Sequence, residues 1–235
     1  MASLTLRAPA ACITASARFF LPKRDKPMII GILNRKGGVG KTSLSTNLAS
    51  ALSLSGNRIL LVDADPQESA LDWQASREGE TLFPVVGMAK PTLHKDIPEL
   101  ARNYNHILID GPPGINDVTR SAMMACDLVV IPVQPSPYDV WAADETVKLL
   151  TEVTIYNDSL KGLFVINRKI KNTALGRDVA SALGDYPLTV AQTAITQRVV
   201  FAESAASGLS VLELAPEGPA SQELNALAKE ILTHS

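Results

Sequence analysis

A glycine-rich segment, residues 35–42, reads R-K-G-G-V-G-K-T and lies between a short apolar run and a helix-like stretch. Apart from the arginine at its first position, it matches the phosphate-loop pattern G-x-x-x-x-G-K-T. Glycines allow consecutive backbone N–H groups to curl around a phosphate, and the start of the following helix attracts negative charge. Lys41 would contact the β- and γ-phosphates, and the Thr42 hydroxyl would bind Mg²⁺. The sequence therefore predicts a nucleotide site whose phosphate-binding residues are Gly37, Gly38, Val39, Gly40, Lys41, Thr42 and Ser43.

Three aspartates follow apolar runs, as metal-binding carboxylates of nucleotide enzymes do. Asp110 ends the run H-I-L-I-D and precedes G-P-P-G, which is the form of an aspartate that holds a Mg²⁺-bound water. Asp63 and Asp65 end the run L-V-D-A-D, and the second strand of a doubly wound sheet lies close to the first. We expect one of these two to support the metal, with Thr42 and Asp110, and the other to orient the attacking water.

Short apolar runs alternate with helix-length segments from Met28 onward, which is typical of a parallel sheet with crossover helices. The expected fold is α/β, a doubly wound, mostly parallel sheet of about seven strands with helices on both faces. The expected strands are 29–33, 58–63, 84–88, 106–110, 128–133, 163–167 and 188–191. The expected helices are 42–55, 142–155, 172–183, 196–207 and 219–233.

The composition bounds the remaining possibilities. The chain has 235 residues, a net charge of −2, and no apolar run near the roughly 20 residues of a membrane span. Its two cysteines lie far apart, so a reducing, cytoplasmic environment is expected. Residues 1–27 carry five basic residues and one acidic residue, and we interpret them as a disordered or mis-assigned extension. Residues 28–235 are expected to form one domain.

The motifs resemble those of the ParA/MinD family of P-loop ATPases with a deviant Walker A motif. The resemblance rests on K-G-G-V-G-K-T at 36–42, V-D-A-D-P-Q at 62–67 and I-D-G-P-P-G at 109–114, and it extends over essentially 28–235. It implies that Lys36 is a signature lysine that reaches the partner subunit's phosphates in an ATP-sandwich dimer. It also implies that Asp65 is the aspartate needed for hydrolysis and Asp63 its metal-side neighbour. Asn167, with Arg168 beside it, would contact the adenine.

The resemblance is strongest to small ParA-type partition proteins, because 27 residues are too few for the helix-turn-helix domain of longer members. It implies a slow ATPase that uses ATP and Mg²⁺, dimerises, binds non-specific nucleoid DNA and positions a cargo. Hydrolysis would be stimulated by DNA and by a cargo-linked partner protein. The cargo could be a plasmid, a chromosome region or a protein organelle such as a carboxysome. A cytoplasmic, nucleoid-associated protein without stable membrane insertion is expected.

DNA binding would need a local basic patch, because the whole chain is slightly acidic. Residues 161–200 have a local charge of +4. The expected DNA contacts within this stretch are Lys169, Lys171, Arg177 and Arg198.

Two other functions stay open on the sequence. A MinD-like membrane-associated ATPase would carry a basic amphipathic C-terminal helix, whereas Lys229 here stands among the acidic Glu223 and Glu230. A metabolic P-loop enzyme of the dethiobiotin-synthetase type would share the fold and turn over a small acid.

Overall fold

The computed structural model describes residues 27–170 and 175–234, so the N-terminal extension lies outside the described residues apart from Pro27. The described chain contains a seven-stranded sheet in the order β3-β2-β4-β1-β5-β6-β7, and every pairing in it is parallel. Its strands are β1 Met28–Ile32, β2 Ile59–Asp63, β3 Val85–Gly87, β4 His106–Asp110, β5 Leu128–Val133, β6 Lys161–Ile166 and β7 Thr189–Val190. The expected fold class is confirmed.

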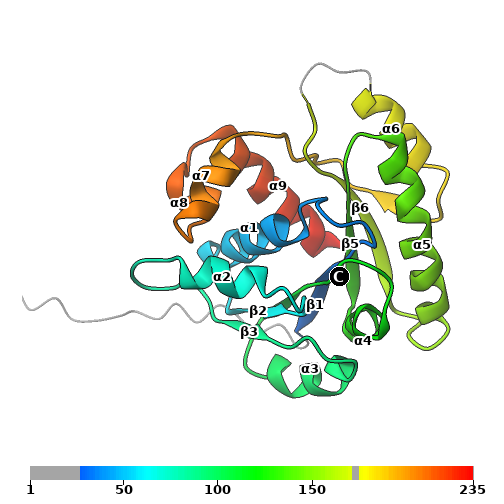
Figure 1. Ribbon diagram of the computed structural model, residues 1–235, viewed down its shortest axis with the longest axis horizontal. Helices are drawn as coiled ribbons and strands as arrows, with labels where there is room; N and C mark the ends of the chain where they lie inside the picture. Colours follow the sequence, from blue (N-terminus) through cyan, green and yellow to red (C-terminus); the bar gives the residue numbers. More distant parts are fainter. Residues whose placement is uncertain (1–26, 171–174, 235) are drawn as a thin grey trace, which may run out of the picture.

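Helices cover both faces of the sheet (Figure 1). Helices α1, α8 and α9 pack on one face, and α3 to α6 pack on the other. No helix of the described residues is both long and apolar enough to cross a membrane. The helices are α1 Lys41–Leu54, α2 Ser69–Ala75, α3 Leu93–Ala101, α4 Asp117–Ala125, α5 Pro137–Thr154, α6 Leu175–Leu183, α7 Val200–Ala206, α8 Val211–Leu214 and α9 Pro219–Thr233.

The central strands are apolar along their whole length because each side chain meets a helix layer, whichever face it points to. In β1, Ile30 belongs to the core beneath α1 and α9, and its neighbour Ile29 belongs to the core beneath α3 to α5. Both side chains are buried. Each such burial stabilises the fold by about 1.5–3 kcal/mol, which fixes the sheet between its two helix layers.

The order of the strands determines where a ligand can bind. Strand β1 lies between β4 and β5, so the chain crosses to opposite sides of β1 in the two halves of the sheet. In such sheets the crevice lies beyond the carboxyl ends of the strands at this switch point. The register pairs Ile32 with Asp110 and Asp110 with Asp63, which brings the phosphate loop and both aspartates to one edge.

Several expected boundaries were wrong. Helix α5 begins at Pro137 rather than at residue 142, because proline suits the first turn of a helix, where its missing N–H is not needed. The helix expected from residue 196 begins at Val200, because Thr196 pairs with Lys169 in an isolated parallel bridge. Helices α2, α3, α4 and α8 were not expected; each is short, with four to nine residues. Residues 172–174 of the helix expected at 172–183 lie outside the described residues, and α6 is described from Leu175.

Candidate functional site

The phosphate loop is held in shape by two side chains from neighbouring strands. Asn167 Nδ2, just after β6, donates a hydrogen bond to Val39 O at 2.8 Å. Gln134 Nε2, just after β5, donates to Gly38 O at 2.9 Å. Gly40 has a φ of 89°, and a Cβ at this position would lie 2.5 Å from Asn167 Nδ2, so glycine is needed there. The loop is therefore fixed by its own glycines and by the ends of β5 and β6.

Lys41 is the first residue of α1 and its side chain is buried. Its Nζ lies 3.2 Å from Lys36 O, so the ammonium folds back over the loop. Burial lowers the pKa of Lys41, while the negative charges of Asp110 and Asp65 favour its charged form. A buried cation at the start of a helix, beside the N–H groups of the loop, is suited to a phosphate.

Asp110, at the end of β4, is buried beside Lys41. Its Oδ1 accepts a hydrogen bond from Ser45 Oγ at 3.0 Å. Its Oδ2 is buried and accepts no hydrogen bond of good geometry within the described part of the chain. Burial raises the pKa of Asp110 to about 7, although the nearby Thr42 hydroxyl favours the charged form. A buried carboxylate oxygen without a partner, close to a threonine hydroxyl, fits a hard cation such as Mg²⁺.

Ser45 is a site residue that the sequence interpretation missed. It lies four residues after Lys41, and its hydroxyl also donates to Lys41 O at 2.9 Å. Because residues four apart share one face of a helix, Ser45 faces the same strand ends as Lys41. This helical spacing was a signal that could have identified it.

Asp63 and Asp65 lie at the same edge but have different surroundings. Asp63 is buried, and its Oδ2 accepts the backbone N–H groups of Ala70 and Leu71 at 2.8 and 3.1 Å. Its Oδ1 accepts the N–H of Asp65 at 3.1 Å. Burial raises the pKa of Asp63, and these N–H donors act in the opposite direction. The Asp65 carboxylate is half-buried and accepts the N–H of Gln67, so it remains at the open side of the edge.

Lys36 lies at the outer lip of the loop and is paired within its own chain. Its Nζ is 2.7 Å from Asp139 Oδ2, and the two side chains are 40% and 3% exposed. Asp139 Oδ1 is buried and has no hydrogen-bond partner in the described chain. No local pattern indicated Asp139, which is 103 residues from Lys36. The structure therefore adds a buried acidic partner to the lysine singled out by its spacing.

A cavity of about 390 Å³ lies beside the loop, on the β6 side of β1, whereas Asp65 follows β2 on the other side. The expected adenine contacts Asn167 and Arg168 both line it, next to Ser43 at the start of α1. Phe201 and Ala202 of α7 form part of the wall. Since apolar walls next to a few polar groups are usual for a base, this cavity is suited to the adenosine half of a nucleotide.

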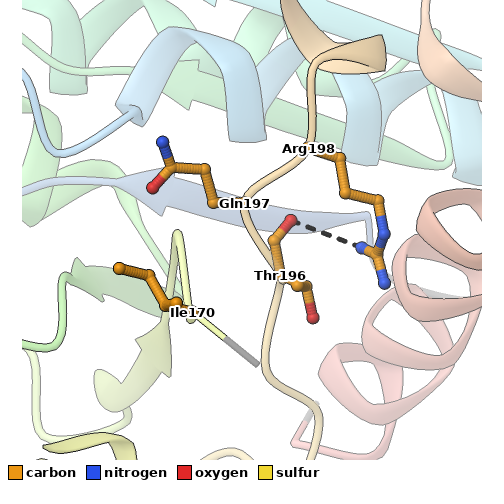
Figure 2. Close-up of a pocket in the computed structure, with 4 residues that line it drawn as sticks. All are labelled: Ile170, Thr196, Gln197 and Arg198. Carbon is orange, nitrogen blue, oxygen red and sulfur yellow. Dashed lines mark hydrogen bonds between the residues drawn. The ribbon is translucent and has the colours of Figure 1, made fainter. Parts of the chain in front are cut away.

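Of the four expected DNA contacts, the structure describes the side chains of Lys169 and Arg198. A second cavity, of about 530 Å³, is lined by Ile170, Thr196, Gln197 and Arg198, and Figure 2 shows Arg198 turned away from Ile170. The Arg198 guanidinium forms two hydrogen bonds with Glu223 of α9, at 2.6 and 2.7 Å. Its charge is therefore compensated within the fold, and its expected role in DNA binding stays a prediction. Lys171 and the Arg177 side chain lie outside the described residues.

The parallel sheet, the phosphate loop after its central strand and the carboxylates at the neighbouring strand ends define a P-loop nucleotide-binding protein. Residues 30–211 match the family model "CobQ/CobB/MinD/ParA nucleotide binding domain", and the chain belongs to this family.

Similar proteins agree with this assignment. The chain is 30% identical to the maintenance of carboxysome distribution protein A of Halothiobacillus neapolitanus, over 88% of this chain and 98% of that protein. It is 32% identical to the chromosome-partitioning ATPase Soj of Thermus thermophilus, over 89% and 97% of the two chains. The structure of MinD from Pyrococcus horikoshii with Mg-ADP has the same fold, with a TM-score of 0.69 at 23% identity over 87% and 96% of the two chains.

Proposed function

We propose that this chain is an ATP-dependent positioning ATPase, which hydrolyses ATP slowly and uses the nucleotide to switch between a free and a cargo-positioning state. The observation that carries the proposal is a buried Lys41 near a buried, partly unsatisfied Asp110 beneath the phosphate loop. The similarity to a carboxysome distribution protein and to a partition ATPase over nearly the whole chain supports cargo positioning.

In the proposed reaction the protein contributes position and charge. Lys41 and the loop N–H groups would hold the β- and γ-phosphates, and Thr42 and Asp110 would hold Mg²⁺, which would supply positive charge for the phosphates. Asp63 anchors the metal-side loop through the N–H groups that it accepts. Asp65, at the open side, orients the attacking water. Asn167 and Arg168 bind the base.

Lys36 extends the proposal to a homodimer. A lysine at the outer lip is too exposed to contribute much to its own subunit's site, and a second nucleotide opposite it would give the charge a partner. In this arrangement Lys36 exchanges Asp139 for the partner subunit's phosphate. The ATP-sandwich dimer, the binding of non-specific double-stranded DNA and a cargo-linked stimulating partner belong to this same proposal, as does a cytoplasmic, nucleoid-associated location.

The test compares Lys36→Ala with Lys148→Ala, which removes a lysine from an exposed Lys–Asp pair on α5. Lys36→Ala should bind ATP within about threefold of the parent protein but lose ATP-dependent dimers in light scattering and lose turnover. Lys148→Ala should resemble the parent protein in all three measurements. Normal dimers and turnover in Lys36→Ala would exclude the sandwich arrangement.

A further inference from the structure

Helix α2 connects the proposed catalytic loop to a distant part of the fold. The loop that follows β2 carries Asp63 and Asp65 and leads directly into α2. Asp63 accepts the N–H groups of Ala70 and Leu71, so its carboxylate holds the first turn of the helix. Any displacement of α2 is therefore transmitted to Asp63 and to the short loop that positions Asp65.

The other end of α2 is held by Arg77, two residues after the helix. Its guanidinium forms an ion pair with Glu213 of α8 and donates to Gly208 O at 3.2 Å. The side chains of Arg77 and Glu213 are only 9% and 15% exposed. Burial alone would raise the pKa of Glu213, but Arg77 and the Ser210 hydrogen bonds hold it below its usual range. This is a largely buried, charge-assisted contact, which is stronger and more directional than a surface pair.

The backbones also approach closely at this point. Gly208 has a φ of 63°, and a Cβ there would lie 2.4 Å from Arg77 N. Trp73 Nε1, one turn earlier in α2, donates to Leu209 O at 3.2 Å. Two hydrogen-bonding side chains and a close backbone contact therefore fix α2 against the turn at 207–210. We call these contacts of Trp73 and Arg77 with residues 208–213 the α2 clamp.

The turn held by the α2 clamp belongs to the base side of the nucleotide site. It follows α7 directly, and α7 contributes Phe201, Ala202 and Ala205 to the wall of the 390 Å³ cavity. After the turn, Val211 N donates to Asn47 Oδ1 of α1 at 2.8 Å. The base-side cavity and the catalytic loop, which lie on different sides of the phosphate loop, are thus linked through one set of contacts.

We propose that Arg77 is a positioning residue that couples the loop carrying Asp63 and Asp65 to the base side of the nucleotide site through the α2 clamp. Occupation of the base-side cavity restrains α7, and the clamp passes this restraint to α2 and the catalytic loop. The Arg77 guanidinium hydrogen-bonds with Glu80, Gly208 and Glu213 among the described residues, so it acts on the site indirectly, through α2 and Asp63. The proposal rests on the ATPase function proposed above.

The first test separates hydrolysis from binding. Arg77→Met keeps most of the apolar stem and removes the ion pair. It should lower kcat for ATP about tenfold, because the catalytic loop loses its restraint, while the Kd for ADP stays within about twofold. Arg77→Lys, which keeps one charged donor, should recover part of the lost kcat. Arg120→Met is the control, because it removes an exposed pair between α4 and α5, and it should keep the parent kcat.

The second test does not need turnover. Hydrogen exchange of amides in residues 63–75 should slow when ADP binds to the parent protein, and this slowing should be lost in Arg77→Met. Exchange in α9 serves as the internal control, since no hydrogen bond of Arg77 in the described residues reaches it. Thermal unfolding identifies the temperature at which every variant remains folded.

The outcomes of these two tests distinguish failure of the coupling through Arg77 from failure of the proposed ATPase function. An Arg77→Met protein with reduced unfolding temperature but unchanged kcat and unchanged ADP-dependent exchange would show that the clamp is merely structural. Equal losses of kcat and ADP affinity would also overturn the coupling. If the parent protein does not hydrolyse ATP, the ATPase proposal fails, and the exchange experiment alone still decides whether Arg77 links the two sides of the site.

Discussion

Two charged regions of this protein differ in whether their charged groups are satisfied by other groups of the chain. At the carboxyl edge of the sheet, Lys41 and Asp110 are buried, and Asp110 retains an oxygen without a hydrogen-bond partner among the described residues. In the basic stretch 161–200, Arg198 is matched by Glu223 through two hydrogen bonds. A buried charge that keeps unused bonding capacity is ready for a ligand, whereas a charge satisfied within the fold contributes to stability. The number of charged residues in a segment does not distinguish the two cases.

The largest effect is expected at the carboxyl edge. Lys41→Ala removes the buried cation of the phosphate loop and the positive charge that favours the ionised form of Asp110. ATP turnover should fall at least about 100-fold, since charge stabilisation of the phosphates is lost where water cannot replace it. Steady-state phosphate release measures this. A variant that retains a third of the parent rate would contradict the assignment of this edge as the catalytic site.

Arg198 should affect stability before it affects DNA binding. Arg198→Met leaves Glu223 with only its bonds to Thr196, and the free energy of unfolding should fall by about 2 kcal/mol. Urea unfolding measures the loss, and the double variant with Glu223→Gln should recover part of it. If unfolding is unchanged while ATP-dependent DNA affinity falls, Arg198 belongs to the DNA surface and the comparison between the two regions is wrong.

A substitution at Lys169 tests whether the basic stretch 161–200 binds DNA. Lys169→Glu should weaken ATP-dependent binding to non-specific DNA about tenfold at low salt, because one phosphate contact is replaced by repulsion. Lys161→Glu is the matched control. It makes the same charge change at the other end of β6. Equal losses for both variants would indicate a general charge effect without a surface at the Lys169 end.

The smallest effect is the acid dependence of stability. Burial alone would raise the pKa of Glu223, but Arg198 and Thr196 outweigh it and hold the pKa below the usual 4.5. A lowered folded-state pKa gives stability that is present above the unfolded pKa and is lost as the pH falls through the folded pKa. Between pH 5 and pH 3 the parent protein should lose about 1 kcal/mol more unfolding free energy than Glu223→Gln. If the unfolding free energies of the two proteins fall in parallel with pH, the Arg198–Glu223 pair does not contribute to stability.

The sequence predicted most of the sheet because its strands are buried on both faces and carry continuous apolar runs. The run H-I-L-I-D at β4 and the run before the phosphate loop were assigned to within one residue. Short helices were harder to predict. Helix α2 has seven residues, and much of what holds it is Asp63 at one end and contacts with residues 208–213 at the other. Such a helix depends on tertiary contacts more than on its own propensity.

The site was predictable where its residues follow one another along the chain. Lys41 and Thr42 were predicted from the phosphate-loop pattern, and the role of Lys36 was predicted from the resemblance to the ParA/MinD family. Ser45 could have been found from its helical spacing. Asp139 could not, because it meets Lys36 across 103 residues, and nothing near either residue indicates the pairing.

The sequence by itself determined the parallel α/β architecture, the phosphate loop and the edge at which three aspartates gather. These follow from local patterns, since strand burial, loop curvature and helix starts depend on neighbouring residues. The tertiary structure decided which charges remain available. It paired Lys36 with Asp139, Arg198 with Glu223 and Arg77 with Glu213, and it left Asp110 with an unused oxygen. Whether a charge is satisfied depends on the groups that folding brings within about 3 Å of it, and those groups come from distant parts of the chain.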